Sequence, residues 1–144
     1  MKFVIHGAFI LCIILALFIS TGCEDEYKCE GNYLEIDVPN LLKTDGYYRL
    51  TFLEGYNQTF TTLRAQTGSE DNYQKLAWAA NKEVLLNGIW TNVVNTASYT
   101  NEEGIAYTVL SVWEESAGDT ITIYCGYDNE CEVHFIDLIN VIIE

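Results

Sequence analysis

Hydrophobic positions follow two different patterns along the chain. Residues 3–19 are almost all apolar, and only His6 and Gly7 interrupt them. From residue 32 onward, apolar and polar residues alternate in short runs that are separated by turn residues. The first pattern is short for a bilayer-spanning helix and has no positive flank after it, which is typical of a signal peptide. Alternation at a period of two instead predicts β-strands with one face toward a core.

The alternating part predicts a series of short strands in one domain, residues 32–144. The expected strands cover residues 33–38, 47–53, 59–65, 75–79, 83–86, 89–94, 105–113, 120–124 and 132–143. Residues 73–84 also contain helix formers, so a helix is the alternative there. About seven to nine short strands with turns between them favour an all-β fold, a β-sandwich.

Composition narrows the class of protein. Ten Tyr, six Phe and three Trp against a single Pro fit an ordered β domain. The chain has 21 acidic and 7 basic residues, which gives a formal net charge of −14. A surface this negative repels nucleic acid and anionic lipid headgroups, so we expect no nucleic-acid partner.

The N-terminal segment carries the marks of export and membrane anchoring. Lys2 supplies a positive charge before the apolar run, and the small residues 20–22 (Ser-Thr-Gly) precede Cys23. This arrangement resembles the lipobox of bacterial lipoproteins, in the relaxed form found in Bacteroidetes. The resemblance implies a signal peptide at residues 1–22 and acylation of Cys23, for example with palmitate, which anchors the chain in the outer membrane of a Gram-negative bacterium. An ordinary signal peptide or an anchor helix is the alternative.

Residues 23–31 form a short acidic tether in this interpretation. Glu24, Asp25 and Glu26 follow the anchor residue directly. They resemble the acidic stretch that sends lipoproteins of the Bacteroidetes to the outer face of the outer membrane. The alternative is a solvated spacer that holds the domain away from the membrane. The spacing alone leaves both interpretations open.

Two stretches in the second half of the chain resemble bacterial Ig-like domains of the invasin and intimin type. In residues 98–110 an acidic turn leads through Gly104 and Ala106 into a strand, and in residues 117–124 a Gly-Asp turn starts the next strand. Gly104 permits the positive φ of a tight turn, and Ala106 is small where sheets approach. The resemblance implies an Ig-like β-sandwich that serves adhesion or binding without catalysis of its own.

The Ig-like resemblance also bears on the cysteines of the mature chain. In such a sandwich the first strand runs parallel to the last, which implies that Cys29 and Cys131 lie at the same pole and form a disulfide. Cys125 shares the strand phase of Ile121 and Ile123, so we expect a buried thiol there. A Cys125–Cys131 bridge is the alternative.

Few residues suggest chemistry. His134 is the one histidine after the proposed signal peptide, and it has no Cys or His pair at ligand spacing. Catalysis and metal binding need several such groups in fixed positions, so we expect no enzyme activity, no cofactor and no metal.

Aromatic side chains are better candidates for ligand contact. Trp90 lies beside polar residues, while Tyr99 and Tyr127 flank turns. Exposed Trp and Tyr side chains contact sugars and proteins through their apolar rings. For Trp78 and Trp113 we expect core packing instead.

These observations predict a non-catalytic surface lipoprotein that serves as a binding or adhesion module for an unknown protein or glycan ligand. One alternative is a carbohydrate-binding accessory lipoprotein of a polysaccharide-uptake system. Another is a structural component of an envelope complex.

Overall fold

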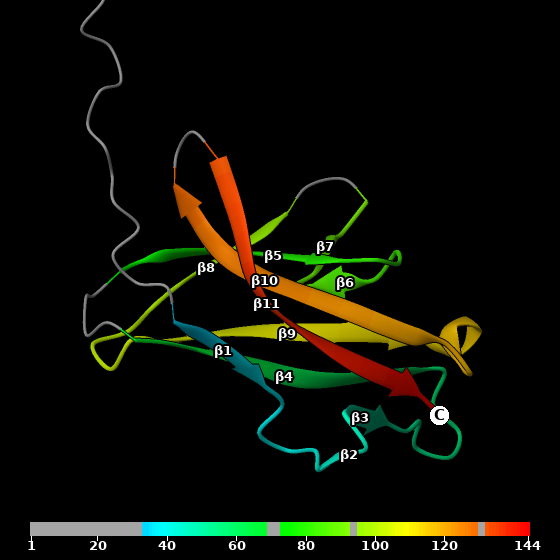
Figure 1. Ribbon diagram of the computed structural model, residues 1–144. Coiled ribbons are helices and arrows are strands. Elements are labelled where there is room, and N and C mark those ends of the chain that lie inside the picture. The colour runs from blue at the N-terminus through cyan, green and yellow to red at the C-terminus, as the bar shows by residue number, and fades with distance from the viewer. Residues whose placement is uncertain (1–32, 69–72, 93–94, 130–131) are drawn as a thin grey trace, which may run out of the picture. The chain divides into compact units, whose positions relative to one another are not determined.

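The computed structural model describes residues 33–68, 73–92, 95–129 and 132–144, which all belong to one structural unit, Gly31–Glu144 (Figure 1). Two β-sheets pack against each other in this unit and form a sandwich, so the prediction of an all-β sandwich is confirmed. Within the described residues, no helix is long and apolar enough to cross a bilayer.

The described residues form eleven strands and one short 3-10 turn. In chain order these are β1 (Leu34–Asp37), β2 (Lys43–Thr44), β3 (Tyr47–Leu50), β4 (Gln58–Thr67), β5 (Lys75–Ala80), β6 (Leu85–Leu86), β7 (Ile89–Trp90), β8 (Thr96–Tyr99), β9 (Ile105–Trp113), η1 (Glu114–Ser116), β10 (Thr120–Asn129) and β11 (Glu132–Ile143).

The two sheets differ in strand order. Sheet A has the order β1-β4-β9-β6-β7, and sheet B has the order β2-β3-β11-β10-β5-β8. Strand β3 pairs with β11 in parallel, whereas β1 pairs with β4 in antiparallel orientation. The hydrogen-bonded parallel partner of the last strand is thus β3, while β1 belongs to the other sheet. Strand β1 still meets β11 across the sandwich, since the Ile36 amide donates to Asp137 Oδ2 at 2.8 Å.

The core lies between the inner faces of the two sheets. Strand β4 places Leu63 and Ala65 inward, and each of them is 0 % exposed. Its facing partners come from β10 and β11, with Ile121, Ile123 and Val141. Full burial of one such side chain stabilises the fold by about 1.5–3 kcal/mol. Alternation between buried and exposed positions in these strands is what the sequence pattern predicts.

The predicted limits agree with the structure for some strands only, since β10 continues to Asn129, beyond the predicted end at residue 124. Strands β9 and β11 have the expected limits, and residues 73–84 contain the strand β5 rather than a helix. The sequence pattern does not predict strand β8, because its inward residues, Thr96 and Ser98, are polar. Their hydroxyls have partners inside the sandwich: Thr96 donates to the Leu86 carbonyl at 3.0 Å, and Ser98 accepts from Trp78 Nε1 at 2.7 Å.

The hairpin of β10 and β11 extends beyond the neighbouring strands, as Figure 1 shows. Its pairing register shifts between Cys125 and Gly126, where β11 carries one extra residue, Ile136. The two backbones come very close at this bulge. A Cβ on Gly126 would lie 1.8 Å from the His134 carbonyl oxygen, so only glycine fits this position.

Candidate functional site

The outer face of sheet A carries exposed aromatic side chains at one end. Strand β4 alternates, so that Leu63 faces the core while Phe60 faces outward and is 72 % exposed. On the neighbouring β9, Val112 is buried and Trp113 points to the outer face, partly exposed. Phe60 pairs with Ser111, two residues before Trp113. Phe60 and Trp113 therefore occupy diagonal positions on adjacent strands, within reach of a common ligand.

A short hairpin adds Trp90 to this face. Strands β6 and β7 are joined at Asn87 and Gly88, whose φ values of 49° and 77° are both positive, as the tightest hairpin turns require. The ring of Trp90 stacks on that of Trp113 with 5.3 Å between centroids and 20° between planes. Such a contact contributes about 0.5–1.5 kcal/mol. Trp90 nevertheless stays 41 % exposed, so the stack leaves much of its ring open to a ligand.

We call Phe60, Trp90 and Trp113 the aromatic row. Phe60, Ser111, Leu85 and Trp90 are paired in register across four adjacent strands, β4, β9, β6 and β7. At about 4.8 Å per strand, the backbones of Phe60 and Trp90 lie roughly 14 Å apart. The row is thus long enough for an extended ligand rather than a single ring.

Polar side chains lie between and beside the rings. Ser111 separates Phe60 from Leu85, and the exposed Gln58 is the register partner of Trp113. Glu114 follows Trp113 directly and is exposed. Hydroxyl, amide and carboxylate groups can accept hydrogen bonds, and the first two can also donate them. The face therefore offers one hydroxyl between the apolar side chains of the row, and an amide and a carboxylate beside Trp113.

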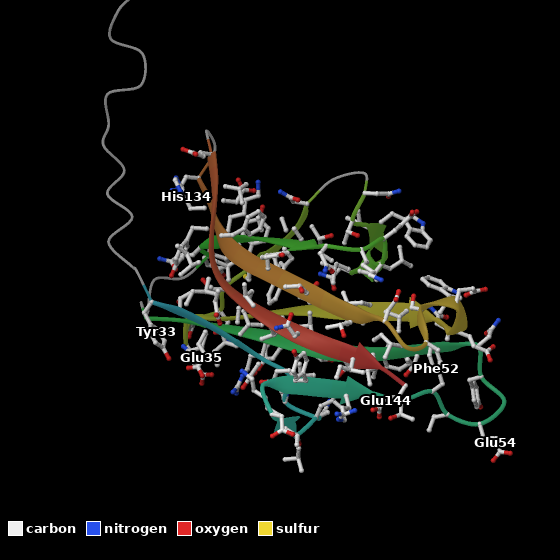
Figure 2. All side chains as sticks on the ribbon, turned by 45° about the vertical axis from the view of Figure 1, so that its right-hand side comes forward. Tyr33, Glu35, Phe52, Glu54, His134 and Glu144 are labelled. Atoms are coloured by element: carbon white, nitrogen blue, oxygen red, sulfur yellow. The ribbon has the colours of Figure 1, made fainter. Side chains whose placement is uncertain are left out.

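The aromatic row lies far from the point at which the chain enters the sandwich. Leu34, at the start of β1, pairs with Thr67, whereas Phe60 lies seven residues earlier on the same strand β4. Seven residues of extended strand span roughly 23 Å. Figure 2 shows Tyr33 at one end of the sandwich and Glu54, which precedes β4, at the other.

Every lysine and arginine of the described residues is engaged with a neighbour. Three of the ion pairs join Arg49 to Glu144, Lys75 to Asp128 and Lys82 to Asp119. The Arg64 guanidinium binds both carboxylate oxygens of Asp37, and this contact raises the pKa of Arg64. Lys43 lies over the ring of Tyr48, 5.6 Å from its centroid. These side chains are partly occupied by their partners, which weakens any attraction for an anionic ligand.

Of the three residues that the sequence nominates for ligand contact, two are exposed. Trp90 lies in the aromatic row, and its partial exposure agrees with the expectation. Tyr99 is 59 % exposed on β8, which belongs to the other sheet. Tyr127 is only 7 % exposed, because it shares the inward phase of Ile123, and its hydroxyl donates to the Tyr33 carbonyl at 3.0 Å. Tyr127 is thus a core residue rather than part of a ligand surface, and the three do not form one site.

Of the cysteines, the structure describes Cys125 alone. Cys23, the acidic residues 24–26 and both members of the predicted Cys29–Cys131 disulfide lie outside the described residues. Cys125 is free and fully buried, as its strand phase indicates. Burial away from water raises the pKa of the Cys125 thiol far above its ordinary value, so the thiolate is disfavoured and the group is unreactive.

The remaining polar groups do not assemble into a reactive centre in the described part of the chain. His134 is exposed near the tip of the β10–β11 hairpin, where Figure 2 labels it, with Nε2 3.3 Å from Glu132 Oε2. Among the described residues there is no group of three or more His, Cys, Asp or Glu side chains that could hold a metal ion.

Sequence reasoning misses two members of the aromatic row. Trp113 is expected in the core, but it follows Val112 on a strand whose even-numbered residues face inward, so it must face outward. Phe60 has the same relation to Thr61 and Leu63 on β4. The strand phase could have identified both residues. It decides which face of the sheet a side chain lies on, whatever the size and apolar character of its ring.

Comparison of the chain with protein-family models, with curated proteins and with solved structures gave no match.

Proposed function

We propose that this chain is a non-catalytic lipoprotein of the outer membrane that displays a β-sandwich binding module at the cell surface. The proposal joins two parts, an anchor at Cys23 and a ligand-binding face on sheet A. The small residues before Cys23 and the apolar run before them support the anchor.

The observation that carries the binding part is the aromatic row. Phe60 is 72 % exposed and Trp90 is 41 % exposed, although burial of such rings would stabilise the fold by about 1.5–3 kcal/mol each. The core below them is already closed by side chains such as Leu63 and Leu110, which are 0 % exposed. Clustered apolar groups that the fold itself leaves in water are typical of interaction sites.

The position of the row suits display on a tether. A lipid at Cys23 would be joined to Tyr33 by ten residues, which reach at most about 35 Å when extended. The chain enters the sandwich at the Tyr33 end, and the aromatic row lies at the opposite end of sheet A. The row is therefore separated from the start of β1 by most of the length of β4.

Protease treatment of intact cells tests the anchor and the location together. We expect added protease to remove the wild-type protein from intact cells, while a soluble periplasmic marker stays uncut. A Cys23→Ala variant loses its membrane association. With Glu24, Asp25 and Glu26 changed to alanine, the protein stays membrane-bound but becomes protected, if the acidic run directs export.

Protection of the wild type on intact cells, with cleavage only after lysis, would contradict surface display. The protein would then face the periplasm, and a role in an envelope complex would replace adhesion. The lipid anchor would be contradicted if the wild-type protein were found in the soluble fraction, as the Cys23→Ala variant is.

A further inference from the structure

We propose that the aromatic row binds an uncharged glycan chain, with sugar rings against Phe60 and Trp90 and a sugar hydroxyl on Ser111, which lies between them. This inference deepens the proposed binding function and rests on it. It concerns the chemical class of the ligand at the same face of sheet A.

Between the rings of the row lie one hydroxyl group, on Ser111, and one apolar side chain, Leu85. A sugar ring presents C–H groups on its faces and hydroxyls around its rim. Phe60 and the stacked Trp90–Trp113 pair offer apolar surfaces for the faces, and Ser111 lies between them as a hydrogen-bonding group for a rim hydroxyl.

The length of the row suits a polymeric ligand. Its ends are roughly 14 Å apart across four paired strands, which a chain of sugars can follow and a single small molecule cannot. The outer face of a sheet is also open, so a polymer can enter and leave from either side. The row therefore fits an internal stretch of a polysaccharide as well as its end.

The charges near the row favour an uncharged ligand. Each lysine and arginine of the described residues already has an acidic or aromatic neighbour. Around the row the exposed charged residues are the acids Glu83, Glu114 and Glu115, and Lys82, whose ammonium group is paired with Asp119. Carboxylates accept hydrogen bonds from sugar hydroxyls but repel anionic groups, so a neutral glycan is favoured over an acidic one.

The test uses the mature chain without residues 1–22 and with Cys23→Ser, since all described strands and the core belong to Gly31–Glu144. Calorimetry and tryptophan fluorescence are recorded with the neutral oligosaccharides cellohexaose, xylohexaose, mannohexaose, laminarihexaose and maltohexaose. Oligogalacturonate and oligoalginate serve as anionic probes, and phosphatidylcholine vesicles test for a lipid surface. We expect at least one neutral oligosaccharide to bind with a change in fluorescence, and neither anionic probe nor vesicles to bind.

Variants then locate the site. Trp90→Ala and Phe60→Ala should each weaken that binding by about tenfold or more, as expected for central aromatic contacts. Tyr99→Ala is the matched control, because it removes an exposed aromatic ring from the other sheet and should leave the affinity within about twofold. Because Phe60 is highly exposed, we expect the Phe60→Ala variant to fold. This variant therefore tests the site even if Trp90→Ala, which removes the stack on Trp113, disturbs the fold.

Three results would overturn the glycan proposal. These are no binding to any neutral oligosaccharide of the panel, equal or tighter binding to the anionic probes or vesicles, and binding that both row variants leave unchanged. None of them bears on surface display, which the protease experiment on cells decides separately. If the protein is exposed at the cell surface but binds none of the glycans, the proposed binding function stands and the proposal of a glycan ligand is wrong.

Discussion

The two outer faces of the sandwich both carry aromatic side chains, but the rings have different surroundings. On sheet B, Phe135 is the register partner of Gly126, and its ring lies 6.0 Å from that of Tyr124. Gly126 is buried, and Ala77 opposite it is 1 % exposed, although both lie on the outward side of their strands. On sheet A, the register partner of Phe60 is Ser111, which stays partly exposed.

The backbone next to the exposed rings therefore differs between the two sheets. On sheet B, Phe135 pairs with Gly126, where two backbones approach too closely for any side chain, and an aromatic ring opposite such a glycine can cover it. On sheet A no described position of this kind lies beneath the aromatic row. An aromatic residue on an outer face therefore indicates a ligand site only where the backbone below it does not need the cover.

The largest expected effect concerns the close approach on sheet B. Gly126→Ala places a Cβ 1.8 Å from the His134 carbonyl oxygen and 2.5 Å from Phe135 Cα, so β11 must move away from β10. We expect the free energy of unfolding to fall by about 3 kcal/mol or more, measured by urea denaturation.

Gly118→Ala is the control for loss of a glycine without such a contact. Gly118 has a φ of 86°, and a Cβ added there would meet no atom within 4 Å. The cost of this substitution is therefore only that of positive φ, about 1 kcal/mol. Equal effects of the two substitutions would show that the β10–β11 bulge can relax. The close backbone approach at Gly126 would then no longer distinguish sheet B from sheet A.

A smaller effect compares one ring from each face. Phe135→Ala uncovers Gly126 and removes the contact with Tyr124, and we expect it to lower the free energy of unfolding by about 1–2 kcal/mol. Phe60→Ala should change it by less than about 0.5 kcal/mol, because that ring is 72 % exposed. Thermal and urea denaturation of both variants decide the matter. If Phe60→Ala were the more damaging one, the aromatic row would be a stabilising feature rather than a ligand site.

The smallest effect depends on pH and reports whether the inside of β10 is dry. Burial raises the pKa of Cys125 above its ordinary value of 9.0, so the folded chain keeps this proton at a pH where the unfolded chain releases it. The stabilisation is complete below pH 9 and decreases as the pH rises, by about 1 kcal/mol between pH 9 and pH 10. Urea denaturation of the wild type and Cys125→Ala across this range should show the extra slope only in the wild type. Parallel pH profiles would mean that water reaches the thiol.

Much of the fold follows from alternation in the sequence. Strand β9 alternates strictly enough to give its limits, and the inward phase of Cys125 follows from Ile121 and Ile123. Strand β8 could not be found this way, because Thr96 and Ser98 face inward through hydrogen bonds to distant residues, Leu86 and Trp78. Such bonds exist only once the sandwich has formed.

The sequence predicts only part of the candidate site, because the rest depends on contacts between distant segments. The polar surroundings of Trp90 indicate exposure, whereas the stack on Trp113 depends on how β6 and β7 join sheet A beside β9. The prediction for Tyr127 is wrong because it gives proximity to a turn more weight than the phase of this residue on β10. Strand pairing between distant segments is set by the packing of the whole domain, and local pattern carries little information about it.

The antiparallel pairing of β1 with β4 also has a mechanical consequence. A pull on the chain at Tyr33 against a load held at Phe60 draws β1 and β4 in opposite directions along their own axes. The hydrogen bonds between these strands run perpendicular to that force, so they share it and must break together rather than one after another. The ion pair between Asp37 and Arg64 spans the same two strands at the end of the ladder nearer Phe60. Drag on a bound polymer would thus load this module in shear, the geometry in which a small β domain resists force best.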